Sequence, residues 1–132
     1  MNEGLEEGTR MTLDFHKIDA TEGVVPVVVQ DADSARVLLV AYADQAALSE
    51  ALKRRIAVFR STSRDELWIK GATSGDYLEL VEVRVNCEQN SLLYLVRLKG
   101  SGACHTKGSD GKSRKSCFYR RISGGAIQFV AD

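Results

Sequence analysis

Hydrophobic residues in the first third of the chain fall into two short runs separated by a polar turn. Residues 24–30 are rich in valine, and residues 36–42 form a second apolar run after the turn-forming segment 31–34. β-Branched residues favour strands, whereas Asp and Ser favour turns. This pattern predicts a β-hairpin over residues 24–42.

A helix is predicted directly after this hairpin. The side chain of Asp44 can accept hydrogen bonds from the free backbone N–H groups that open a helix. Apolar residues then recur at the three-to-four spacing of one buried stripe, at Ala47, Leu48, Ala51 and Leu52. The basic residues at positions 53–55 would lie at the C-terminal end, where cations oppose the negative pole of the helix dipole. This placement favours a capping role over a patch that binds nucleic acid.

Further strands are predicted by short runs of apolar and β-branched residues, which cover residues 56–61, 66–70, 78–87 and 91–98. The alternation of apolar and polar residues slips between Leu80 and Val81, and this slip indicates a β-bulge. Several short strands at hairpin spacing with one good helix predict an α+β fold. We expect a mostly antiparallel sheet, or a small barrel-like β-rich domain, with one main helix.

Length and charge limit what such a domain can do. The 132 residues fit one domain, which we place at residues 21–132 after a charged, mobile arm at residues 1–20. Eighteen basic and eighteen acidic residues cancel, so no overall field would attract nucleic acid or an anionic membrane. No apolar run could span a bilayer, and the acidic N-terminus is unlike a signal peptide. We therefore expect a cytoplasmic protein.

All three cysteines lie in the last third of the chain, at Cys87, Cys104 and Cys117, and His105 directly follows the second. An odd number of cysteines in a reducing compartment favours metal binding or catalysis over disulfides. Thiolate and imidazole are zinc ligands, and three protein ligands leave a fourth position open for catalysis. Because no C-x-x-C pair is present, the spacing alone also allows scattered, buried cysteines that act as small hydrophobic residues.

Three motifs accompany these cysteines: W-I-K-G-A-T-S-G at 68–75, C-H-T at 104–106 and S-C-F at 116–118. Together they resemble the phosphoribosyl-AMP cyclohydrolase family of histidine biosynthesis, over roughly residues 24–121. The resemblance implies an enzyme that opens the adenine ring of 1-(5-phosphoribosyl)-AMP by adding water at C6 and breaking the C6–N1 bond. It also implies a homodimer whose zinc sites lie at the subunit interface, with cysteines drawn from both chains.

The resemblance further implies that Cys87, Cys104 and Cys117 bind zinc and leave one position for water. Zinc lowers the pKa of its bound water to about 7, which supplies hydroxide at neutral pH. Histidine exchanges protons near neutral pH, and His105 adjoins a predicted ligand, so we predict that it carries the proton during catalysis. The alternative is that His105 is a fourth ligand in a closed site.

The implied substrate is a small purine nucleotide with two phosphates, which need two anion sites. The first is predicted in a small loop whose backbone N–H groups and hydroxyls can approach an anion, with two cations nearby. Its residues are Arg64, Lys70, Gly71, Thr73, Ser74 and Gly75. Trp68 is either a core residue or a surface on which the purine stacks. The second site could use Lys112, Arg114 and Lys115, although a solvated loop is the alternative.

Two features depart from the family's pattern. The family has an acidic D-C-D-x-D segment that binds magnesium, whereas the matching positions here are Asn86, Cys87, Glu88, Gln89 and Asn90. Magnesium relies on carboxylates, so we expect weak or absent magnesium binding at Asn86, Glu88 and Asn90. Residues 108–114 also look like an insertion between the second and third cysteines. The alternatives left open are a zinc hydrolase acting on another purine or amidine, and a non-catalytic zinc-binding protein.

Overall fold

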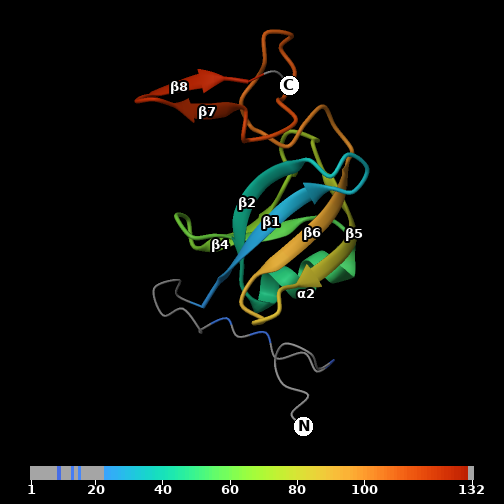
Figure 1. Ribbon diagram of the computed structural model, residues 1–132. Coiled ribbons are helices and arrows are strands. Elements are labelled where there is room, and N and C mark those ends of the chain that lie inside the picture. Colours follow the sequence, from blue (N-terminus) through green and yellow to red (C-terminus); the bar gives the residue numbers. More distant parts are fainter. Residues whose placement is uncertain (1–8, 10–12, 14, 16–22, 131–132) are drawn as a thin grey trace.

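A four-stranded sheet forms the centre of the computed structural model, which describes Thr9, Leu13, Phe15 and residues 23–130. Its strands lie in the order β2-β1-β6-β5 (Figure 1), and their bounds are Val25–Asp31 for β1, Val37–Ala43 for β2, Leu78–Val85 for β5 and Leu92–Leu98 for β6. The mobile arm predicted at residues 1–20 falls, except for three residues, outside the described part of the chain.

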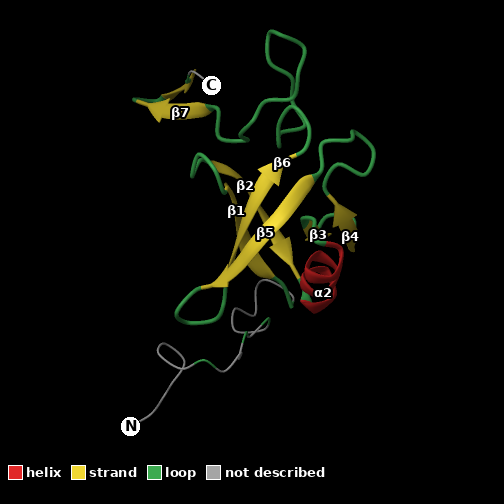
Figure 2. Ribbon diagram, turned by 90° about the vertical axis from the view of Figure 1, so that its right-hand side faces the viewer, coloured by secondary structure: helices red, strands yellow, loops and turns green. Residues whose placement is uncertain are grey.

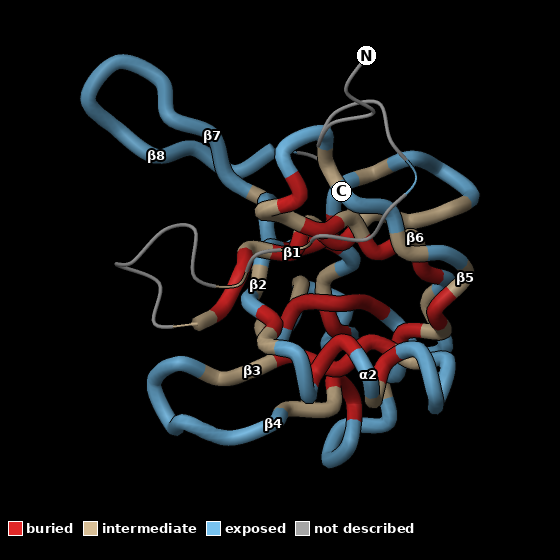
Figure 3. Tube along the Cα trace, turned by 90° about the horizontal axis from the view of Figure 1, so that it is seen from below, coloured by how far each residue is buried: buried red, intermediate tan, exposed pale blue. Residues whose placement is uncertain are grey.

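One helix and two hairpins complete the described elements. Helix α2 (Gln45–Arg54) and the hairpin of β3 (Val58–Ser61) and β4 (Glu66–Ile69) pack on one side of the sheet (Figure 2). The second hairpin, β7 (Arg120–Ser123) and β8 (Ala126–Phe129), projects away from the sheet with all its residues exposed (Figure 3). Within the described residues, no helix has the length and hydrophobicity needed to cross a membrane.

The strand pairing is mostly antiparallel. β1 pairs antiparallel with β2, as predicted for the hairpin at residues 24–42, and β5 pairs antiparallel with β6. β1 also pairs with β6, in parallel, because the long segment between these two strands provides the crossover that parallel neighbours require. The predicted β-rich fold with one main helix is confirmed, and the described strands do not close into a barrel.

Alternation along the strands explains which side chains form the core. Val25, Val27 and Val29 of β1 are buried, whereas the residues between them are only partly buried. Successive side chains of a strand point to opposite faces, so these three share one face and one core. At the centre of this core, the hydroxyl of Tyr94 donates a hydrogen bond to the backbone oxygen of Val58 at 3.4 Å, which satisfies its polar group where it is buried.

Helix α2 begins at its predicted cap. The side chain of Asp44 accepts a hydrogen bond from the backbone N–H of Ala47 at 2.8 Å. Ala47, Leu48 and Ala51 are buried as predicted, but Leu52 is 47% exposed, so its assignment to the buried stripe is wrong. Each residue advances about 100° around a helix, and this rotation places Leu52 past the edge of the stripe.

Strand β5 has the predicted bulge but ends earlier than predicted. Its register against β6 shifts between Leu80 and Glu82. The strand ends at Val85, so Asn86 and Cys87, predicted as its last residues, lie instead in the turn that follows. This difference decides where the first cysteine lies relative to the other two.

Candidate active site

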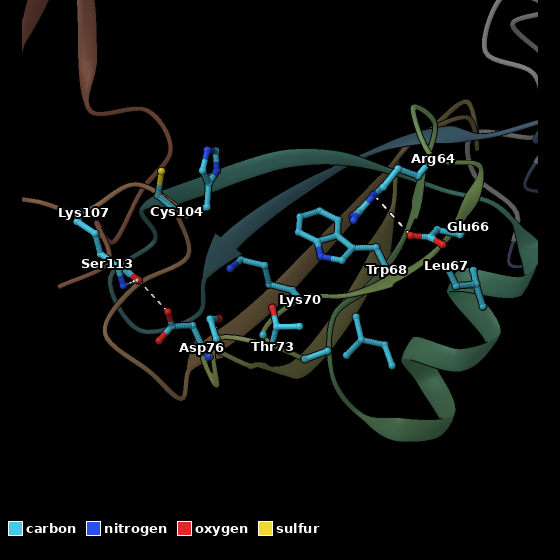
Figure 4. Close-up of a pocket in the computed structure, with 15 residues that line it drawn as sticks. Arg64, Glu66, Leu67, Trp68, Lys70, Thr73, Asp76, Cys104, Lys107 and Ser113 are labelled. Atoms are coloured by element: carbon cyan, nitrogen blue, oxygen red, sulfur yellow. Dashed lines mark hydrogen bonds and ion pairs between the residues drawn. The ribbon is translucent and has the colours of Figure 1, made fainter. Parts of the chain in front are cut away.

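A cavity of about 420 Å³ lies between the β3–β4 hairpin, the loop after β4 and the loop that carries Cys104 (Figure 4). This volume is within the range of small-molecule binding sites. The predicted site residues that line it are Arg64, Trp68, Lys70, Gly71, Thr73, Ser74, Cys104 and His105. Two motifs that are distant in the chain, W-I-K-G-A-T-S-G and C-H-T, therefore meet at one cavity.

Cys117 is positioned by the edge strand of the sheet. Its backbone N–H donates to the carbonyl oxygen of Leu38 at 2.6 Å, and the hydroxyl of Ser116 donates to that of Val37 at 2.8 Å. Ser116 is 1% exposed, and its hydroxyl oxygen accepts from the backbone N–H of Phe118. The S-C-F motif is therefore a segment docked on β2, which fixes the position of the Cys117 sulfur.

Cys104 reaches the same place through backbone pairing with the segment before Cys117. The N–H of Cys104 donates to the carbonyl oxygen of Arg114, and the N–H of Arg114 donates to that of Thr106, both at 3.0 Å. Gly102 permits this close approach, because a Cβ there would lie 2.2 Å from the Arg114 oxygen. A larger residue at position 102 would push the two cysteine-bearing segments apart.

The sulfur atoms of Cys104 and Cys117 lie 4.0 Å apart. Burial disfavours the thiolate of Cys104, but hydrogen bonds from the hydroxyl and backbone N–H of Thr106, together with the contact to Cys117, outweigh it and lower the pKa of Cys104. Burial and the neighbouring Cys104 raise the pKa of Cys117. The first proton is therefore lost from Cys104, and the resulting thiolate disfavours loss of the second proton from Cys117.

This cysteine pair fits a zinc ion. Two sulfurs bound to zinc at about 2.3 Å in tetrahedral geometry lie roughly 3.8 Å apart. The observed separation of 4.0 Å is close to that value, and a cation between the sulfurs would favour both thiolates. Among the described residues of one chain, no third Cys, His, Asp or Glu completes a metal-binding group with them.

Cys87 lies at the opposite end of the sheet. It follows β5, whose last residue Val85 is paired with Leu92 at the start of β6, whereas Cys104 follows Leu98 at the end of β6 (Figure 2). A strand of this length spans roughly 20 Å at 3.3 Å per residue. One chain therefore does not bring Cys87 to the other two cysteines.

The turn around Cys87 is closed by Asn86. Its side-chain oxygen accepts from the backbone N–H groups of Asn90 and Ser91, both at 2.9 Å, and its side-chain nitrogen donates to the side-chain oxygen of Asn90 at 2.6 Å. Among the predicted magnesium positions, only Glu88 is a carboxylate. The two neutral amides thus build the turn, and they supply no anionic ligands.

Lys70 is a buried cation at the cavity wall. It follows β4, and it is only 6% exposed. Burial lowers the pKa of Lys70, while the negative charges of Asp76, Cys104 and Cys117 act in the opposite direction. Because a buried ammonium is costly without an anionic partner, a bound phosphate would stabilise it. This environment fits the predicted role of Lys70 as an anion contact.

The glycine-rich loop after β4 is shaped by close backbone contacts. Gly71 has a φ of +91°, and a Cβ there would lie 2.4 Å from the backbone nitrogen of Tyr77, so only glycine fits. Gly75 donates its N–H to the Gly71 oxygen at 2.8 Å; it closes the turn and does not line the cavity. Thr73 and Ser74, in contrast, line it.

The aromatic and exposed basic residues of the cavity come from the β3–β4 hairpin. The ring of Trp68 lies 5.4 Å from that of Phe59 in the core, and Trp68 also lines the cavity, so both predicted roles are compatible with its position. The guanidinium of Arg64 lies 3.5 Å from the carboxylate of Glu66. Both side chains are exposed, so this ion pair is weak and Arg64 can bind another anion.

The residues predicted for the second phosphate do not line this cavity. The guanidinium of Arg114 lies over the ring of Tyr119, 4.1 Å from its centroid, and 5.3 Å from the centroid of Phe129. Lys112 and Lys115 are exposed and also lie outside the lining. Cation–π stacking turns Arg114 toward the projecting β7–β8 hairpin.

Seven lining residues were not predicted as site residues: Glu66, Leu67, Ile69, Ala72, Asp76, Lys107 and Ser113. Asp76 directly follows the T-S-G motif, which is a weak signal that it belongs to the same loop. Ser113 lies 37 positions from Asp76 and donates to its carboxylate at 2.8 Å. No spacing in the sequence indicates that contact.

Known proteins match most of this chain. Residues 39–119 match the family model described as phosphoribosyl-AMP cyclohydrolase. The chain is 43% identical over 108 residues to the phosphoribosyl-AMP cyclohydrolase of Hyphomonas neptunium, covering 82% of this chain and 77% of that relative. It is 43% identical over 107 residues to the phosphoribosyl-AMP cyclohydrolase of Archaeoglobus fulgidus, covering 81% of this chain and 93% of that relative. It is also 36% identical over 107 residues to a histidine biosynthesis bifunctional protein of Aquifex aeolicus, covering 81% of this chain and 49% of that relative.

Proposed function

The chain belongs to the phosphoribosyl-AMP cyclohydrolase family of hydrolases, and we propose that it opens the adenine ring of 1-(5-phosphoribosyl)-AMP in histidine biosynthesis. Water adds at C6 of the purine, and the C6–N1 bond breaks. The observation that carries this proposal is that Lys70, Trp68, Cys104 and His105 line one cavity, which combines a buried ammonium, an aromatic ring, a thiol of the cysteine pair and an imidazole.

A bound zinc ion would lower the pKa of a water molecule and so supply hydroxide near neutral pH. Cys104 and Cys117 would hold it, and their separation of 4.0 Å supports this role. Since Cys87 lies at the far end of the sheet, we propose that the third thiolate comes from Cys87 of a second copy. The functional unit is then a homodimer with two shared sites.

His105 is proposed to carry the proton. It lies at the cavity wall directly after Cys104, and its side chain is exposed to the cavity. It takes one proton of the water as the oxygen bonds to C6, and it gives that proton to N1 as the C6–N1 bond breaks. The second proton of the water passes to the exocyclic nitrogen on C6, so that C6 becomes the carbonyl carbon of an amide. Lys70 and the hydroxyls of Thr73 and Ser74 bind a phosphate of the substrate, and Trp68 stacks on the purine.

Magnesium is not required in this proposal. The amides of Asn86 and Asn90 are engaged in closing their turn, so the positions that are acidic in the family offer the ion little charge. The substrate phosphates would instead be neutralised by basic side chains of the cavity.

An absorbance assay on phosphoribosyl-AMP tests the proposal, with zinc-loaded protein in the presence and absence of magnesium. We expect turnover that depends on zinc and does not change with magnesium. Turnover of another purine or amidine, with none on phosphoribosyl-AMP, would support the related-hydrolase alternative. Tightly bound zinc without turnover on any of these would support a non-catalytic zinc-binding protein.

A further inference from the structure

The segment between the second and third cysteines forms a short hairpin. Lys107 and Ser113 face each other in an isolated antiparallel β-bridge. The N–H of Gly108 donates to the carbonyl oxygen of Lys112 at 2.9 Å, and the N–H of Gly111 donates to that of Gly108 at 3.0 Å. We call residues 107–113 the insertion hairpin. Its two ends are thereby held next to each other, close to Cys104.

The insertion hairpin is bound to the wall of the cavity by a hydrogen bond to Asp76. Ser113 is 8% exposed, and its hydroxyl donates to one carboxylate oxygen of Asp76 at 2.8 Å. The backbone N–H of Ser101 donates to the other oxygen at 3.1 Å. Gly100 packs against the same residue, since a Cβ at position 100 would lie 2.8 Å from the Cα of Asp76. Three segments distant in the chain thus meet at one carboxylate.

The hydrogen bonds to Asp76 hold Lys107 at the cavity. Its ammonium lies 3.4 Å from the hydroxyl oxygen of Ser113, and the residue lines the cavity while staying exposed to solvent (Figure 4). Lys70 lines the same cavity from the loop after β4. The hydrogen bond from Ser113 lowers the pKa of Asp76 against the effect of burial, and both lysines act in the same direction. Lys70, Lys107 and Asp76 are two cations and one anion, so these three side chains together carry one net positive charge.

We propose that Lys107 binds a phosphate of the nucleotide substrate, and that Ser113 and Asp76 are positioning residues that hold Lys107 at the cavity. The proposal rests on the proposed function for the identity of the nucleotide. The ammonium of Lys107 makes a long contact to a hydroxyl, which leaves donors for a charge-assisted hydrogen bond to an anion.

Lys107→Met is the central test, and Lys112→Met is its matched control. Lys112 lies in the same hairpin but does not line the cavity. We expect the KM for phosphoribosyl-AMP to rise on the order of tenfold in Lys107→Met, as for the loss of one charge-assisted hydrogen bond. The value of kcat and the zinc content should stay close to those of the unmodified protein. Lys107→Arg should keep most of the affinity, and Lys112→Met should behave as the unmodified protein.

Ser113 variants test the positioning role. Ser113→Ala should raise KM by a smaller factor at nearly constant kcat, and Ser113→Thr, which keeps the hydroxyl, should restore it. A KM unchanged in Lys107→Met, or raised equally in Lys112→Met, overturns the inference. Loss of kcat and zinc in Ser113→Ala with an unchanged KM overturns the positioning role.

A binding measurement separates this inference from the proposed function. Trp68 is the single tryptophan of the chain and lines the cavity, so its fluorescence reports binding of phosphoribosyl-AMP without turnover. If the zinc-loaded protein shows no turnover, the proposed function fails, and the dissociation constant then decides the inference. A tenfold weaker binding in Lys107→Met alone supports it. Equal binding by both methionine variants, or no binding by the unmodified protein, overturns it.

Discussion

Cys104 and His105 are neighbours in the chain, yet their side chains lie in different surroundings. Cys104 is buried, and its sulfur contacts Thr106 and the sulfur of Cys117. His105 is exposed at the cavity wall. A ligand must be held rigidly by its environment, whereas a group that carries protons must reach the substrate. The local structure therefore supports a metal-binding role for Cys104 and a proton-transfer role for His105.

These roles predict different losses. Cys104→Ser should lose zinc in elemental analysis and, with it, activity, because one of the two thiolates on this side of the site is removed. His105→Ala should keep its zinc and lose roughly 10²- to 10⁴-fold in kcat, the usual contribution of a general acid–base group. Zinc content and kcat are measured on the same preparations. If zinc falls in His105→Ala as well, His105 is a ligand.

At the scale of elements, helix α2 and the β3–β4 hairpin are joined through Asp44. Its side chain caps the helix by accepting from the N–H of Ala47, and its second carboxylate oxygen lies 3.5 Å from the guanidinium of Arg60 on β3. The same hairpin carries Trp68 and Arg64 to the cavity. The cap therefore stabilises the helix and also supports one wall of the candidate active site.

Asp44→Ala should lower the free energy of unfolding by about 1 kcal/mol, the usual cost of removing a helix N-cap. Urea denaturation at one fixed protein concentration measures the effect, which should appear as a lower midpoint with an unchanged slope. Asp44→Asn is the control, because asparagine caps a helix as well as aspartate but cannot form the ion pair with Arg60. An equal loss in both variants would assign the stability to the ion pair.

At the scale of the whole molecule, the distance between the cysteines is the main constraint. Cys104 and Cys117 are adjacent, but the full length of β6 separates them from Cys87. If three thiolates share one zinc ion, the third must come from another chain. A site divided in this way can be rebuilt from two different defective chains, which a site within one chain cannot.

Mixing Cys87→Ser with Cys104→Ser protein, followed by dissociation and reassociation, should therefore restore activity. Each variant alone lacks a ligand at both sites, whereas a mixed dimer has one site with all three cysteines intact. If the chains pair at random, half of the dimers are mixed, and each mixed dimer has one site with all three cysteines and one defective site. Activity near one quarter of the unmodified level is then expected. No recovery on mixing, with each variant folded and dimeric, would contradict the shared site.

Local sequence patterns determined the secondary structure and the family of this protein. The valine-rich strand β1, the cap at Asp44 and the bulge after Leu80 are each specified by residues that are close together in the chain. Such features depend on backbone preferences and on alternation between two faces, which a short segment contains in full. The motifs around Lys70, Cys104 and Cys117 likewise indicated the family to which the chain belongs.

The tertiary structure alone decided which loop residues meet at the cavity. Asp76 and Ser113 are 37 positions apart, and their hydrogen bond places Lys107 at the wall, while Arg114 in the same loop stacks on Tyr119. Loop side chains take their directions from contacts made after the sheet has formed, and no local period encodes those contacts. The sequence could therefore name the chemistry of the site, and only the folded chain could show which lysine serves it and that Cys87 lies at the opposite end of the sheet.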